Sequence, residues 1–133
     1  MQTPRFQPGF RISFYDVIVL IVGAIGAGLA YRHWGPAVLL VAFVVGHFFL
    51  FCNVFRIARG LELIWAGVFT ALAAATVIWE FPGWPMTIGL ALATTLVVIV
   101  VEMRKPSYHG AWWRRINPGL PEWWESQCAS DSE

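Results

Sequence analysis

The sequence predicts an all-α integral membrane protein, folded as an antiparallel bundle of four transmembrane helices. Three observations support this fold class. First, 58% of the 133 residues are hydrophobic and only 13% are charged, whereas soluble proteins average about 45–50% and about 25%. Second, the apolar residues gather in four stretches of about 20 residues, the length that crosses a hydrocarbon core of about 30 Å. Third, eight of the nine Lys and Arg residues lie on one side of these stretches.

The basic residues orient the chain. Arg32 alone lies in the first connection, and the other eight lie in the N-terminal arm, the second connection and the C-terminal tail (Arg5, Arg11, Arg56, Arg59, Arg104, Lys105, Arg114 and Arg115). Short cytoplasmic loops carry an excess of Lys and Arg, so we expect both termini to be cytoplasmic. The same rule leads us to expect the bacterial inner (cytoplasmic) membrane as the location.

A single membrane domain, residues 1–133, accounts for the whole chain, because four spans leave no room for a second domain. Residues 1–11 are expected to form an irregular arm, since they contain two prolines and a glycine. The four transmembrane helices are expected within residues 12–105, at Ile12–Tyr31, Pro36–Phe55, Leu61–Ile78 and Pro85–Val101. Residues 106–133 then form a Trp-rich cytoplasmic tail at the membrane interface.

The first span has an alternative interpretation as a signal peptide, since Arg5 and Arg11 precede an apolar run. Asp16 interrupts the boundary between the basic and apolar regions of such a peptide, and Ile12–Tyr15 lengthens the run. Both features favour an uncleaved span.

Small residues recur at a spacing of four in each span and predict the faces on which the helices touch. The sets are Ala24 and Gly28, Ala42 and Gly46, Gly67 with Ala71 and Ala75, and Gly89 and Ala93. Small side chains let two backbones approach closely in lipid, where no hydrophobic force drives helices together. These faces serve either the bundle itself or a partner subunit.

The tail is expected to be irregular or broken, because Pro118 and Pro121 prevent one continuous helix. Its candidate interfacial or docking residues are Trp112, Trp113, Arg114, Arg115, Trp123 and Trp124. Paired Trp beside Arg is typical of a segment lying at a membrane interface. Trp and Arg also dominate protein binding hot spots, so docking of another protein is the alternative.

Ionisable residues inside a span are functional candidates, and His47 is the deepest of them. It lies near the middle of the second span, and Asn53 and Arg56 follow on the same predicted helix. A packed, hydrogen-bonded His47 is the first interpretation. The alternatives are a proton relay and a haem or metal ligand.

Charged residues gather at the cytoplasmic ends of the spans. Asp16, Arg56, Arg59 and Glu62 are predicted to form an ion-pair network, or alternatively to hold a lipid phosphate through the two arginines. Cys52 is expected to share a helix face with Arg56, four residues away.

No motif for catalysis or cofactor binding is present. The chain has no HExxH or CxxC sequence and no Gly-rich phosphate loop, so we predict no enzymatic activity, no cofactor and no metal site. No basic stripe with interleaved aromatics lies outside the membrane flanks, so we expect no nucleic-acid partner.

These observations lead to two hypotheses about function. The first is a non-catalytic accessory or structural subunit that binds the lipid bilayer and other membrane proteins, or further copies of itself. The alternative is a small transporter, channel or proton-coupled carrier that acts as a homo-oligomer through His47.

Overall fold

The computed structural model of the protein describes residues 6–35 and 37–130, and every regular element in them is a helix. Four helices are long: α1 (Phe14–Trp34), α2 (Ala37–Phe49), α3 (Arg59–Trp79) and α4 (Trp84–Met103). A π-helical turn, η1 (Leu50–Phe55), extends α2, and the tail holds α5 (Trp113–Ile116) and α6 (Leu120–Ser130). Arg5, counted in the charge asymmetry, and Pro36, the predicted start of the second span, lie outside the described residues.

The four long helices, with η1 counted as part of the second, are each long and apolar enough to cross a membrane. The four predicted stretches are therefore confirmed, with small shifts at their ends. The third begins at Arg59 and not at Leu61, because the backbone of Ala58 is extended and Arg59 is the first helical residue. The second is α-helical only to Phe49.

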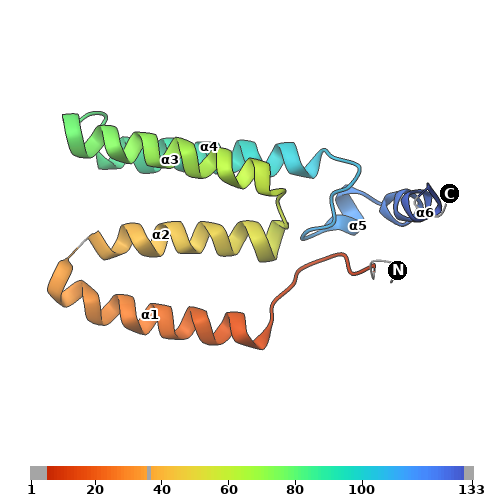
Figure 1. Cartoon of the computed structure of the whole chain (residues 1–133), viewed down its shortest axis with the longest axis horizontal. Coiled ribbons are helices and arrows are strands. Elements are labelled where there is room, and N and C mark those ends of the chain that lie inside the picture. The colour runs from red at the N-terminus through yellow and green to blue at the C-terminus, as the bar shows by residue number, and fades with distance from the viewer. Residues whose placement is uncertain (1–5, 36, 131–133) are drawn as a thin grey trace.

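Consecutive long helices lie side by side, and the chain turns back at each of the short connections between them (Figure 1). The N-terminal arm and the two tail helices lie beyond the same end of the long helices (Figure 1). The hydrophobic core joins the end of the second helix to α3 and α4. Its buried members are Phe51, Ile57, Trp65, Phe69, Ala91 and Val98.

α1 lies at the margin of the molecule. Ser13 caps its first turn, and the Asp16 carboxylate accepts a hydrogen bond of 2.8 Å from the backbone N–H of Ser13. This reciprocal arrangement stabilises the start of the helix. None of the 21 residues of α1 is buried, and its neighbour among the long helices is α2.

The small-residue faces are not packed against other helices of the bundle, and their use by a partner subunit stays a prediction. Ala24, Ala42 and Gly46 line an open crevice between α1 and α2, and Gly28 and Gly46 have open space where a side chain would lie. Gly67 and Gly89 are exposed, with open space where a side chain would lie. α3 and α4 instead meet through large and hydroxyl-bearing side chains, because the indole of Trp65 and the threonines can bury their polar atoms only where they find partners.

Candidate functional site

His47 faces the interior of the molecule. Its ring stacks on the Trp65 ring of α3, with centroids 4.5 Å apart and planes 13° apart, and lies 4.2 Å from the Phe43 ring. Nδ1 lies 2.8 Å from the carbonyl oxygen of Phe43. Because a carbonyl oxygen can only accept, Nδ1 is the nitrogen that carries the hydrogen. The imidazole is therefore held by aromatic rings and by its own helix.

Trp65 connects His47 to α4. Its indole N–H lies 3.1 Å from the carbonyl oxygen of Ala91 and 2.9 Å from Oγ1 of Thr95. Further along the same helix pair, Oγ1 of Thr76 and Oγ1 of Thr87 lie 2.7 Å apart, and both threonines are buried. These contacts hold α3 and α4 together by hydrogen bonds between helices.

Sequence reasoning missed the contacts of Trp65 and the threonines. A signal was available, since Thr76, Thr87 and Thr95 are polar residues inside apolar spans. Such residues hydrogen-bond across helices in membrane proteins. The spacing of Gly and Ala instead favoured the interpretation that α3 and α4 meet through their small residues.

Asn53 and Arg56 do not continue the face of His47. The Asn53 side chain donates to the carbonyl oxygen of Phe49 at 3.3 Å. Arg56 ends the π-helical turn in the left-handed conformation, with φ of 49°. Cys52 lies within η1 and Arg56 directly follows it, so the shared face of the two residues stays a prediction. The Cys52 thiol lies 3.5 Å from a carboxylate oxygen of Glu62.

The ion-pair form of the predicted cluster is also corrected. Asp16 caps α1 as described, and a guanidinium nitrogen of Arg56 donates to the carbonyl oxygen of Gln7 at 2.5 Å. Within residues 6–35 and 37–130, the one ion pair joins Lys105 to Glu102 at 2.7 Å. The Asp16 carboxylate accepts a hydrogen bond from the backbone at the start of α1 and does not pair with any arginine that the structure describes. The number and sign of the charges in the sequence do not reveal this capping role. The lipid-phosphate form of the cluster stays a prediction.

The Trp-rich tail packs on the N-terminal arm. The Phe6 ring makes edge contacts with the rings of Trp113, at 6.1 Å, and Trp124, at 5.4 Å. The Arg114 guanidinium lies over the Trp113 ring at 5.7 Å. Trp123 is half-buried beside Trp124, whereas Arg115 is exposed. Much of the aromatic surface that was predicted to face lipid or a partner is thus used within the chain.

Backbone hydrogen bonds join the tail to the arm and to the end of the second helix. The N–H of Gly9 donates to the His109 carbonyl at 2.7 Å, and the N–H of Ala111 donates to the Val54 carbonyl at 2.8 Å. The N–H of Arg11 donates to the Asn53 carbonyl at 3.1 Å. We call residues 6–11, 53–57 and 108–124 the terminal assembly. Its three segments lie far apart in the sequence, so no local pattern predicted it.

Tyr108 and Gly110 lie at the centre of the terminal assembly. The Tyr108 side chain is buried, and its hydroxyl donates to the Ala111 carbonyl at 2.8 Å. Burial, together with the nearby Glu102 carboxylate, raises the pKa of Tyr108 to about 12. Gly110 lies against the backbone carbonyl of Phe55, where a Cβ atom would overlap it. Trp112 next to it is largely exposed and is the ring of the tail most available to a partner.

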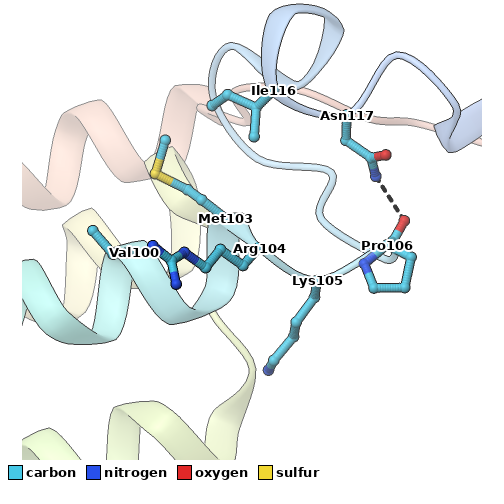
Figure 2. A pocket seen from close by; sticks show the side chains of 7 residues that line it. All are labelled: Val100, Met103, Arg104, Lys105, Pro106, Ile116 and Asn117. Carbon is cyan, nitrogen blue, oxygen red and sulfur yellow. Dashed lines mark hydrogen bonds between the residues drawn. The ribbon is translucent and has the colours of Figure 1, made fainter.

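A groove of about 540 Å³ lies where α4 meets the tail (Figure 2). The Asn117 amide donates to the Pro106 carbonyl at 2.6 Å and so holds the tail against the end of α4. Figure 2 shows Arg104 folded back along α4, and the Lys105 ammonium pairs with Glu102 of the same helix at 2.7 Å. The groove is lined by Val100, Met103, Arg104, Lys105, Pro106, Ile116 and Asn117.

In the part of the chain that the structure describes, no three His, Cys, Asp or Glu side chains lie close enough together to hold a metal ion. Comparison with known proteins finds no matching family model, no matching curated protein and no matching solved structure.

Proposed function

We propose that the four long helices cross the bacterial inner membrane as an antiparallel bundle with both termini in the cytoplasm. Two observations support this topology. Each helix has the length and hydropathy of a span, and eight of the nine basic residues lie on the side of the termini. Basic residues in short loops stay on the cytoplasmic side of such membranes.

Within this membrane the protein acts as a non-catalytic interaction subunit, which binds another membrane protein or a second copy of itself. The observation that supports this function is the incomplete contact between α1 and α2. An apolar crevice of about 290 Å³ remains between them, and small residues from both helices line much of it (Gly23, Ala24, Ala27, Ala42 and Gly46).

A crevice of this composition suits a further helix. In lipid, helices associate through close packing, and Gly and Ala bring their backbones near enough for it. α1 has no buried residue, so its small-residue face would gain packing contacts that the chain alone does not supply. The exposed Trp112 and Arg115 offer a second contact at the membrane surface, where Trp and Arg anchor many interfaces.

Filling the crevice tests this function. Ala27→Leu places a larger side chain between α1 and α2, whereas Val22→Leu enlarges a side chain of the same helix outside the crevice, at a position that is 62% exposed. The wild-type protein, cross-linked in the membrane and purified in mild detergent, is expected in a larger assembly. Ala27→Leu should reduce its yield several-fold, and Val22→Leu should not. Recovery of the wild-type chain only as a monomer, without a cross-linked partner, would contradict the proposal.

A second candidate is a proton-coupled carrier or channel that works as a homo-oligomer through His47. The observation in its favour is an ionisable ring, 9% exposed, inside the second candidate span. His47→Leu separates the two functions. Loss of a proton-dependent flux with the fold retained would favour the carrier, whereas an unchanged assembly and unchanged fluxes would favour the interaction subunit.

A further inference from the structure

The terminal assembly encloses a small cavity that carries positive charge. Its volume is about 50 Å³, which is room for more than one water molecule and hence for a small oxyanion. Residues from all three segments surround it: Phe6, Gln7, Pro8, Arg56, His109 and Trp124. Phe6 and Trp124 supply aromatic walls, and Arg56 and His109 supply hydrogen-bonding groups.

Arg56 is partly buried there without a carboxylate partner. Its recorded hydrogen bond goes to the Gln7 carbonyl, and no Asp or Glu among residues 6–35 and 37–130 pairs with it. Burial, and the nearby positive charge of Arg11, lower the pKa of Arg56 from its usual value. A partly buried guanidinium next to a second positive charge is stabilised when an anion compensates it.

The backbone holds Arg56 in an uncommon conformation. Its φ of 49° lies in the left-handed region, which residues with a Cβ adopt rarely and at some cost in free energy. Strain of this kind persists where surrounding contacts impose it, and it gathers at binding sites. Here the π-helical turn before Arg56 and the bond to Gln7 impose it.

His109 adds a second polar group. Its Nδ1 lies 2.8 Å from the Ser107 carbonyl, so Nδ1 is the donor and Nε2 remains for a ligand. A phosphate group matches both side chains. Its oxygens can accept the paired N–H groups of the Arg56 guanidinium, and its P–OH group can donate to Nε2 of His109.

We propose that the cavity between Arg56 and His109 is a binding site for a phosphate group. The group belongs either to an anionic lipid headgroup or to free inorganic phosphate, and both share the chemistry that the cavity recognises. The proposal goes beyond partner binding, since it concerns a different part of the molecule. The bound phosphate would tie the arm, the second helix and the tail together.

Ligand-dependent thermal stabilisation tests the site, because a ligand that binds only the folded state raises Tm. One arm adds inorganic phosphate to the full-length protein in a neutral detergent. The other reconstitutes it in phosphatidylcholine nanodiscs with or without phosphatidic acid. A rise in Tm in the first arm identifies free phosphate as sufficient, and a rise in the second arm alone identifies the lipid headgroup.

Substitutions distinguish specific binding of phosphate in the cavity from non-specific attraction by the positive charge of the protein. Arg56→Asn removes the charge while keeping a residue that tolerates positive φ, and Arg11→Gln weakens the field without altering the cavity wall. Both should weaken binding, the first by on the order of ten- to one-hundred-fold. Arg104→Gln, at an exposed position outside the cavity lining and with the same charge change, should bind as the wild type does.

Arg11→Gln also serves as a control for misfolding, because it leaves the hydrogen bond between Arg56 and the Gln7 carbonyl in place. An unchanged or higher Tm of this variant without ligand, with a smaller rise on adding ligand, supports the site. No rise in Tm in either arm for the wild type, or an equal rise in all variants, would overturn the proposal.

Discussion

Gly110 allows the tail to pack closely on the end of the second helix, because it has no side chain. Its α-carbon lies beside the carbonyl of Phe55, and the hydroxyl of Tyr108 closes the same space. A β-carbon would therefore meet backbone on one side and a buried phenol on the other, neither of which yields easily. The tail can pack on the end of the second helix only because position 110 is glycine.

Gly110→Ala is expected to destabilise the docked tail by about 1–3 kcal/mol, the usual cost of forcing atoms into a packed site. Gly119→Ala is the matched control, because open space surrounds that position. Limited proteolysis and thermal unfolding in mild detergent measure the effect. Equal protease resistance of the two variants would contradict the close approach.

Tyr108 gives the assembly a dependence on pH in the alkaline range. Its pKa of about 12 when folded lies above the usual value of 10.0, so the folded state favours the neutral phenol. The stabilisation is complete below pH about 10 and is lost as the pH rises toward 12. A difference titration at 295 nm between the wild type and Tyr108→Phe should give a pKa near 12. A value near 10 would show that the phenol is not buried.

Among the elements, α3 and α4 form the best-defined pair. Polar contacts at two levels join them: Trp65 with Thr95, and Thr76 with Thr87. Bonds between helices in a membrane contribute on average about 0.6 kcal/mol each, so these contacts specify the register of the pair more than they add to its stability. α1 has no comparable contact with α2, which is consistent with its place at the margin.

A double-mutant cycle on Thr76→Val and Thr87→Val tests the register of α3 and α4. We expect a coupling of about 0.5–1.5 kcal/mol in the free energy of unfolding, because the first substitution already removes the shared bond. The measurement is unfolding in mixed micelles. Thr70→Val, at an exposed position of α3, serves as the control with Thr87→Val and should show no coupling.

The number and approximate bounds of the long helices could be predicted, since length and hydropathy determine them locally. The contact faces of α3 and α4 could not be predicted from small residues alone, because Trp65 and the threonines compete for the buried side. His47 was placed at the right depth, but its stacking on Trp65 depends on how two helices meet. The terminal assembly could not be predicted from local patterns, because its contacts join residues far apart in the sequence, such as Gly9 with His109 and Phe6 with Trp124.

At the scale of the whole molecule, the terminal assembly links the two ends of the chain to the second helix. In the proposed membrane it lies at the cytoplasmic surface. At the other margin of the molecule, α1 keeps an open crevice beside α2. A partner is therefore expected to bind along α1 within the membrane.

Cysteine labelling in intact bacterial cells tests the central claim of a four-span protein with both termini in the cytoplasm. In a Cys52→Ala, Cys128→Ala background, His33→Cys reports on the end of α1, next to the first connection, and Ser130→Cys reports on the tail; both positions are exposed. We expect a membrane-impermeant maleimide to label His33→Cys in intact cells and to label Ser130→Cys only after permeabilisation. Labelling of Ser130→Cys in intact cells, or of neither position before permeabilisation, would contradict it.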